Sequence, residues 1–326
     1  MTEMPVARTR GEAEGRGANR LRSGWLFAGG AVTLLLTALI GGAALDSVAA
    51  LMPLVPLLAI AALLAGGRRV IWLAVPGLIG ALALIAVEAG GGHGDVAGPG
   101  VVVVTHNVGR ENRDPEGTVT ALAHSGADIL LLQETDGTVA PFLRRLRAQY
   151  PFASRCRRRC SFAIFSRWPL GRDRWRFRNA GGRAVGPGLM QVPVRLPWGS
   201  MARLATVHLS RLGTGEERAA QRVSLAGAVG QVSDPALILA GDFNLTPWGR
   251  PMRRLDTALA PLHRTTRATF SFPARWHGWR VPWPLLPLDH LYAGPAWRVA
   301  SVQRLPATGS DHFPVRVNLV WNNRGI

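Results

Sequence analysis

The chain has 326 residues, 48% of them hydrophobic, and its formal net charge of +18 comes from arginine alone because the sequence contains no lysine. This length accommodates one large domain together with shorter segments, and the sequence has no solenoid-type repeat. The charge favours anionic partners such as nucleic acid, anionic lipid head groups or polyphosphates, but it does not choose among them. Abundant Arg, Ala, Gly and Pro are also typical of a GC-rich bacterial genome.

The N-terminal segment, residues 1–22, is polar and rich in arginine. It has no apolar periodicity with which to bury a face against another element. Segments of this kind do not gain enough from burial to offset the entropy of ordering. We therefore expect a disordered tail.

Three apolar segments follow within residues 23–88, and none of them contains a charge: Trp25–Leu45, Val48–Ala65 and Val70–Val87. A helix rises about 1.5 Å per residue, so the first segment just crosses a hydrocarbon core of about 30 Å. A cleaved signal peptide is the competing interpretation of the first segment. Three such segments in succession favour a three-helix membrane anchor.

The arginines predict which way this anchor is oriented. Five of them precede the first apolar segment, and Arg68 with Arg69 lies between the second and third, whereas the first loop offers only Asp46. Positively charged loops stay in the cytoplasm. Three spans would then put the N-terminus in the cytoplasm and the rest of the chain outside the bacterial cell membrane.

A glycine-rich stretch, residues 89–100, predicts a linker between the anchor and a globular domain at 101–326. Two cysteines in the globular part, Cys156 and Cys160, are too few for a zinc site. In an oxidising compartment they would form a small-loop disulfide, and the alternative is a reduced, incidental pair.

Several short apolar runs in the globular part each end in polar residues. The runs Val101–Val104, Asp128–Leu132 and Ala236–Ala240 are typical of strands buried on both faces. Two further runs, Leu204–Leu209 and Pro287–Tyr292, carry histidine and aspartate near one end. Because such strands expose little along their length, we expect their chemistry at their ends.

The polar residues at these strand ends suit a hard metal ion and a phosphate. Oxygen ligands such as Glu134, Asp242, Asn244 and Asp311 favour Mg²⁺, with Mn²⁺ or Ca²⁺ as alternatives, over zinc. Two histidines, His208 and His312, then remain for proton transfer or for binding a phosphoryl oxygen.

Taken in order, Asn107, Gln133-Glu134, His208, Gly241-Asp242-Phe243-Asn244, Asp289 and Ser310-Asp311-His312 resemble the endonuclease/exonuclease/phosphatase superfamily. The strand Phe162–Leu170, reading FAIFSRWPL, is similar to another of its motifs. The resemblance covers roughly residues 100–320 and implies an α/β fold, the four-layer α-β-β-α sandwich of DNase I-like enzymes.

The same resemblance implies a role for each matching residue. Asn107, Glu134 and Asp311 would form the metal site. His208, Asp242, Asn244, Asp289 and His312 would be catalytic: Asp242 and Asn244 orient the attacking water and hold the phosphoryl group, and Asp289 fixes and charges His312. His208 matches a second catalytic histidine, for which the sequence identifies no carboxylate partner.

The architecture of an anchor followed by this domain also resembles a membrane-anchored bacterial subgroup that includes VanJ-type teicoplanin-resistance proteins. That resemblance implies a phosphohydrolase that acts on lipid-linked cell-wall precursors. A segment rich in tryptophan and arginine, Phe270–Leu288, precedes Asp289. It suits a membrane interface or stacking on single-stranded bases, and packing of a long loop onto the sheet is the plainer interpretation.

Three functions follow as hypotheses. The first is an anchored, Mg²⁺-dependent hydrolase of a phosphodiester or pyrophosphate, and the second is an anchored extracellular nuclease. The third is a catalytically inactive module that binds phosphorylated ligands. The sequence does not identify the substrate, the number of metal ions or the oligomeric state. It also does not identify the physiological pathway or a protein partner.

Overall fold

The computed structural model describes residues 6–40, 46–89, 97–155, 161–178, 184–232 and 234–322. The chain divides into two compact units. The helical unit runs to Glu88 and includes Trp248–Arg250, and the sheet unit holds the remaining residues. Cys156, Cys160 and most of the glycine-rich stretch lie outside the described residues.

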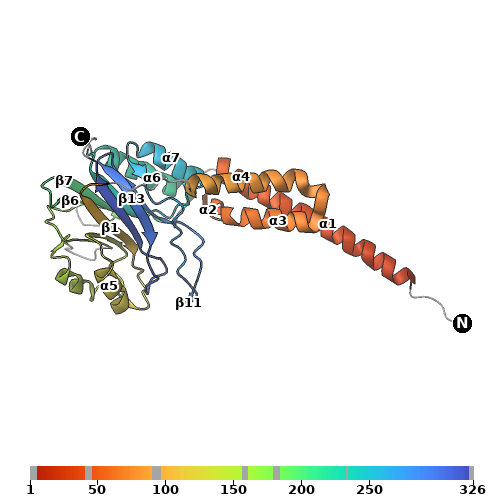
Figure 1. The fold of residues 1–326 in the computed structure, drawn as a ribbon, viewed down its shortest axis with the longest axis horizontal. Helices are drawn as coiled ribbons and strands as arrows, with labels where there is room; N and C mark the ends of the chain where they lie inside the picture. Colours follow the sequence, from red (N-terminus) through yellow and green to blue (C-terminus); the bar gives the residue numbers. More distant parts are fainter. Residues whose placement is uncertain are drawn as a thin grey trace. The chain divides into compact units, whose positions relative to one another are not determined.

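The helical unit is built from α1 (Val6–Ile40), α2 (Asp46–Ala49), η2 (Met52–Leu54), α3 (Val55–Gly66), η3 (Gly67–Val70) and α4 (Ile71–Ala89) (Figure 1). Small residues let these helices approach closely. A Cβ atom on Gly24 would lie 2.5 Å from the Cα atom of Gly66, and one on Gly80 would lie 2.7 Å from Leu35. This close packing of Gly and Ala is typical of helices in membranes.

Two helical stretches of this unit are long and apolar enough to cross a membrane, Arg16–Ile40 and Met52–Glu88. The expectation of three separate transmembrane helices was wrong. The second and third apolar segments belong to one helical stretch because a short 3-10 turn, η3, joins α3 directly to α4. Gly67, with φ of +56°, reverses the chain direction there.

Within the N-terminal segment, for which we expect a disordered tail, α1 begins at Val6. Its Ala, Arg, Glu and Leu residues have high helix propensity. The apolar half of α1 packs against α3, so the helix is already nucleated and extends toward the N-terminus at little cost.

The sheet unit contains two six-stranded mixed sheets and a two-stranded hairpin. The first sheet has the order β13 (Trp297–Arg304), β14 (Val315–Trp321), β1 (Gly100–Asn107), β2 (Ile129–Gln133), β4 (Phe162–Ser166) and β3 (Phe152–Ala153). The second has the order β5 (Arg174–Arg178), β6 (Ala184–Arg195), β7 (Met201–His208), β8 (Leu237–Asp242), β12 (Asp289–Ala293) and β9 (His263–Arg264). The hairpin consists of β10 (Arg275–Trp276) and β11 (Trp279–Arg280).

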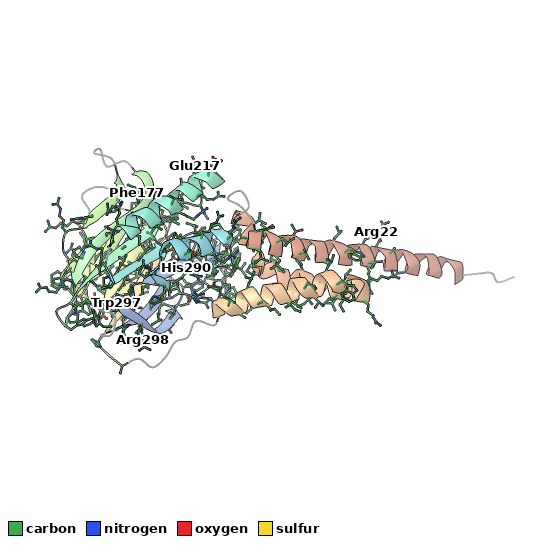
Figure 2. All side chains as sticks on the ribbon, turned by 90° about the horizontal axis from the view of Figure 1, so that it is seen from above. Arg22, Phe177, Glu217, His290, Trp297 and Arg298 are labelled. Atoms are coloured by element: carbon green, nitrogen blue, oxygen red, sulfur yellow. The ribbon has the colours of Figure 1, made fainter. Side chains whose placement is uncertain are left out.

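Three hydrophobic clusters divide this unit into four layers. The central cluster lies between the sheets and includes Val103, Leu131, Ile238 and the buried Trp297 (Figure 2). A second cluster packs α6 (Gly215–Gly230) and α7 (Arg250–Ala258) on the second sheet, and a third packs α5 (Pro115–Ala123) and η4 (Leu143–Ala148) on the first. The result is an α-β-β-α arrangement, as expected.

The apolar runs expected to be strands lie in β1, β2, β7, β8 and β12. Along β2, Ile129 and Leu131 face the central cluster while Leu130 and Leu132 face the helices, because strand side chains alternate between faces. Both faces are buried, which explains why the sequence reads as a continuous apolar run.

Gly241, just before the end of β8, is a position that only glycine fits. Its φ is +153°, and a Cβ atom there would lie 1.9 Å from the carbonyl oxygen of Val207 on β7. We predict that Gly241→Ala disturbs the pairing of β7 with β8 and lowers stability by at least about 2 kcal/mol. The midpoint of thermal unfolding of the full chain in detergent measures the loss.

Gly227→Ala is the matched control because a Cβ atom at this exposed position of α6 meets nothing within 4 Å. Alanine there should raise stability by up to about 1 kcal/mol, since glycine disfavours helix. Equal midpoints for the two variants would contradict the assignment of a constrained strand end at Gly241.

Candidate active site

The ends of strands from both sheets meet around one cavity of about 350 Å³. Asn107 ends β1 and Glu134 follows β2, its parallel neighbour. In the second sheet, His208, Asp242 and Asp289 lie opposite one another across β7, β8 and β12. Seven of the eight expected metal and catalytic residues line the cavity: Asn107, Glu134, His208, Asp242, Asn244, Asp311 and His312.

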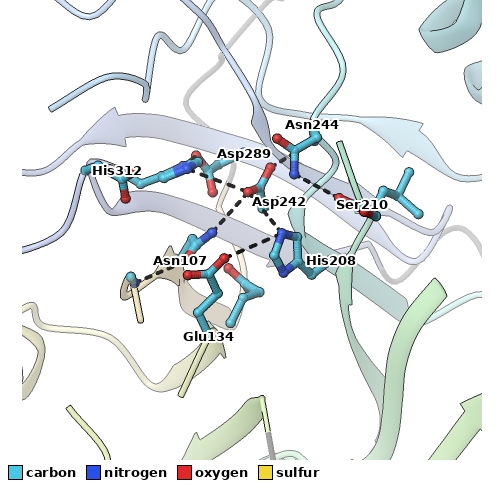
Figure 3. A network of polar contacts seen from close by, with 12 residues as sticks. Asn107, Glu134, His208, Ser210, Asp242, Asn244, Asp289 and His312 are labelled. Atoms are coloured by element: carbon cyan, nitrogen blue, oxygen red, sulfur yellow. Dashed lines mark hydrogen bonds and ion pairs between the residues drawn. The ribbon is translucent and has the colours of Figure 1, made fainter. Parts of the chain in front are cut away.

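Asp242 occupies the middle of this group, and its side chain is almost fully buried. Its Oδ2 atom accepts a hydrogen bond from Asn107 Nδ2 at 3.1 Å and lies 3.6 Å from the Nε2 atoms of both His208 and His312 (Figure 3). Its Oδ1 atom accepts from the backbone N–H of Asn244 at 2.8 Å. Asp242 therefore joins groups from both sheets through a single carboxylate.

Asp289, the eighth residue, lies behind His312 and holds its ring. The two side chains meet at 2.7 Å between Oδ2 and Nδ1, and Asp289 is fully buried. Burial alone would lower the pKa of His312, but the carboxylates of Asp289 and Asp242 raise it to about 10. The imidazole is therefore protonated at neutral pH and presents a positive charge beside the cavity.

His208 has the carboxylate partners that the sequence did not identify. Its Nε2 atom lies 3.6 Å from Asp242 Oδ2 and 3.8 Å from Glu134 Oε1. Glu134 is itself fixed by a hydrogen bond from the backbone N–H of Arg110 at 2.9 Å. A sequence cannot show this partnership, because Glu134 and His208 come from different sheets.

Two site residues have the left-handed backbone conformation that is uncommon outside glycine: Glu134 with φ of +56° and Asn244 with φ of +49°. Such strain persists where the surrounding structure imposes it. The Nδ2 atom of Asn244 donates to the carbonyl of Leu209 at 2.8 Å, which fixes the carboxamide at the cavity wall. Both side chains are thus turned out of the strand direction and toward the cavity.

Several supporting residues were not assigned roles from the sequence. Gln133 Nε2 donates to Thr206 Oγ1 at 2.9 Å and so connects the two sheets beneath the site. Ser310 Oγ donates to the carbonyl of Asn107 at 2.7 Å and accepts from the backbone N–H of His312 at 3.1 Å. The glutamine that ends the otherwise apolar strand β2 was a usable signal for such a buried polar contact.

His106 is a further supporting residue, buried behind the site. Its Nε2 atom lies 3.0 Å from Thr308 Oγ1, in the loop that also carries Asp311 and His312. Burial and, to a smaller extent, the charge on His312 lower the pKa of His106 to about 3. His106 is therefore neutral and orders the loop.

The donor set on the cavity wall fits a hard divalent cation. Glu134 and Asp311 contribute carboxylates and Asn107 a carboxamide, and all three line the same cavity. Across the described ranges, no three His, Cys, Asp or Glu side chains already converge closely enough to enclose an ion. Mg²⁺ commonly takes one or two carboxylates and keeps several waters, so it does not require such an enclosure.

Comparison with known proteins identifies the family to which this protein belongs. The model of the endonuclease/exonuclease/phosphatase family matches residues 104–312, more than half of the chain. The protein belongs to this family and is a phosphoesterase, and the family is typically metal-dependent. A search of curated proteins found no match.

Solved structures share the fold. A family member from Beutenbergia cavernae is similar with a TM-score of 0.55 and 18% identity, covering 68% of this chain and 72% of its own. D. rerio TDP2, complexed with single strand DNA product, is similar with a TM-score of 0.54 and 15% identity, covering 68% of this chain and 98% of its own. Sphingomyelinase C from Streptomyces griseocarneus is similar with a TM-score of 0.50 and 18% identity, covering 68% of this chain and 99% of its own. These comparisons do not support the narrower resemblance to VanJ-type proteins or a role in antibiotic resistance.

The buried pair of Asp289 and His312 predicts how one substitution changes the charge on His312. Asp289→Asn should lower the pKa of His312 from about 10, because burial is then opposed by Asp242 without the adjacent Asp289 carboxylate. Titration of ¹³C-labelled histidine by NMR measures the change, with the His312 signal assigned by its loss in His312→Gln. Asp173→Asn, outside the site, should leave the pKa unchanged. A pKa for His312 that stays near 10 in Asp289→Asn would refute the assigned pairing.

Proposed function

We propose that the protein is a membrane-anchored, Mg²⁺-dependent hydrolase that cleaves a phosphodiester or diphosphate. The observation that carries this proposal is the convergence of Glu134, His208, Asp242 and His312 on one cavity at the ends of two sheets. The proposed roles of these residues follow from their charges and contacts.

His312, protonated through Asp289, balances negative charge on the phosphoryl oxygens as it grows in the transition state. Asp242 orients the attacking water and accepts its proton, and Asn244 donates a hydrogen bond to the phosphoryl group. His208, beside two carboxylates, donates a proton to the leaving oxygen. A divalent cation held by Asn107, Glu134 and Asp311 would supply Lewis-acid charge at the phosphate.

A lipid-linked phosphate or pyrophosphate is the proposed substrate. The two long apolar helices would keep the enzyme at a bilayer. In the sheet unit, Trp276, Trp279 and Trp283 expose 60%, 80% and 78% of their surface next to Arg275 and Arg280. Tryptophan and arginine together suit the region of lipid head groups.

A nuclease is the second candidate. The exposed tryptophans would equally stack on unpaired bases, and a relative in fold has been solved with a single strand DNA product. A catalytically inactive binding module is least consistent with the sequence, because it should have lost Glu134, Asp242 or His312, and all three are present.

We further propose that the catalytic domain lies outside the cytoplasm of a bacterium. Gly24 on α1 lies against Gly66 of α3, so Arg22, labelled in Figure 2, and the Arg68-Arg69 pair lie at the same end of the helical unit. Ala31 and Leu35 of α1 lie against Gly77 and Gly80 of α4, so α4 runs parallel to α1. If the arginine end is cytoplasmic, α4 leads the chain outward.

The proposed chemistry is tested by substitution and metal removal. Glu134→Gln and His312→Gln should each lower kcat on bis(p-nitrophenyl) phosphate by a factor of about 100 or more, since each removes charge from the transition state. EDTA should abolish turnover by the wild-type protein, and excess Mg²⁺ should restore it. The protein is assayed at full length in detergent.

Glu216→Gln, at an exposed position in the first turn of α6, is the matched control and should retain full turnover. Circular dichroism verifies that each variant is folded. Turnover that survives both EDTA and Glu134→Gln would show that the site has been misassigned.

The proposed orientation is tested with reporters fused after Ile326. Alkaline phosphatase folds only after export, whereas green fluorescent protein exported through the Sec route stays dark. We expect active phosphatase and no fluorescence. The reverse result would place the domain in the cytoplasm and remove the main support for an extracytoplasmic lipid-linked substrate.

A further inference from the structure

A second cavity, of about 580 Å³, adjoins the catalytic cavity. The two have five wall residues in common: Arg110, Glu134, Arg211, Phe272 and Asp311. The remaining wall comes from the loop after β1, from the β10–β11 hairpin and from Gly309 and Ser310 in the loop before β14. A molecule bound at the catalytic residues can therefore extend directly into the second cavity, whose volume suits a small ligand group.

Four arginines line this second cavity: Arg110, Arg113, Arg211 and Arg275. Arg110 is partly neutralised, because its Nε atom lies 3.3 Å from Asp136. The other three form no ion pair with any residue in the described ranges, and the Nε atom of Arg275 is buried there without a hydrogen-bond partner. Three guanidinium groups without a carboxylate partner in the described ranges leave the cavity positively charged, which favours an anion there.

Two of these arginines lie at the β10–β11 hairpin. Arg275 belongs to β10, and the guanidinium of Arg113 lies 3.6 Å from the point where a Cβ atom of Gly278 would be. Gly278 has φ of +90°, so this turn both requires glycine and leaves room for Arg113 to pack over it. Arginines held in this way are pre-organised to bind a phosphate through two parallel hydrogen bonds.

The acidic groups on the same wall do not cancel this charge. Glu134 and Asp311 lie on the part shared with the catalytic cavity, where they belong to the proposed cation site. Glu111 is the one other acidic residue among those lining the second cavity. The part of the wall beyond the catalytic residues is therefore positively charged, with Trp276 and His277 at its side.

We propose that the second cavity binds a phosphate group that is not itself attacked, so that the substrate is a diphosphate and not a simple phosphodiester. This inference rests on the proposed function. Water attacks the terminal phosphorus in the catalytic cavity, its proton passes to Asp242, and the bond from that phosphorus to the bridging oxygen breaks. The bond electrons pass to the phosphate in the second cavity, whose charge the arginines balance.

The test compares a diphosphate with a substrate that has a single phosphate. Arg113→Gln/Arg275→Gln changes the two arginines that line only the second cavity. For the full-length protein in detergent, we expect kcat/KM on farnesyl diphosphate to fall about 10-fold or more, since a hydrogen bond to a charged group is worth at least that. The value on bis(p-nitrophenyl) phosphate should stay within about twofold, because this diester makes no use of the second cavity.

Arg174→Gln/Arg298→Gln is the matched control, since both arginines are exposed and neither lines the catalytic or the second cavity (Figure 2 labels Arg298). It should leave both substrates unaffected. Adenosine diphosphate as a third substrate separates a nucleotide source from a lipid source, and arginine-dependent turnover of either diphosphate supports the proposal. Equal losses on all substrates, or no loss on any diphosphate, would overturn it.

Binding tests the cavity separately from the proposed function. Methylenediphosphonate, which cannot be hydrolysed, and methylphosphonate are titrated calorimetrically into the wild-type and variant proteins. We expect the wild type to bind the diphosphonate at least about 10-fold more tightly and Arg113→Gln/Arg275→Gln to lose that preference. If the wild type hydrolyses nothing yet keeps this preference, the proposed function fails and the phosphate site stands. If the wild type shows no preference for the diphosphonate, the phosphate site is refuted.

Discussion

The concentration of carboxylates at one end of two sheets is the constraint on which the site depends. Glu134, Asp242, Asp289 and Asp311 gather there, although the chain as a whole has a net charge of +18. Asp242 and Asp289 are almost fully buried, and an isolated buried carboxylate is costly. The protonated His312 compensates part of this charge, and the excess that remains is what a divalent cation would neutralise.

The two sheets are held in register by polar contacts under this cluster. The hydrogen bond from Gln133 to Thr206 joins them, and the bond from Asn107 to Asp242 repeats the connection at the cavity floor. Since packed cores deform little, a small shift of one sheet would break several of these contacts together. The positions of the proposed catalytic groups therefore depend on the apolar core between the sheets as much as on their own hydrogen bonds.

Much of the sheet unit could be predicted from local sequence. Strands buried on both faces are short apolar runs, and the polar residues that end β1, β7 and β8 stand out against them. The sequence did not reveal the contact of His208 with Glu134, because that contact joins different sheets. Nor did it reveal the second cavity, since its arginines come from loops far apart in a chain rich in arginine. The helical unit was mispredicted at Gly67, where a 3-10 turn joins α3 directly to α4 in place of a loop.

The central claim is that the cluster around Glu134 exists to hold a divalent cation next to a protonated histidine. Binding of Mn²⁺ to the detergent-solubilised protein, followed by electron paramagnetic resonance, tests that claim without any substrate. We expect Glu134→Gln to weaken Mn²⁺ binding about 10-fold or more, because it removes a charged ligand, while Glu216→Gln leaves it unchanged. Equal affinities for the wild type and Glu134→Gln would contradict the account.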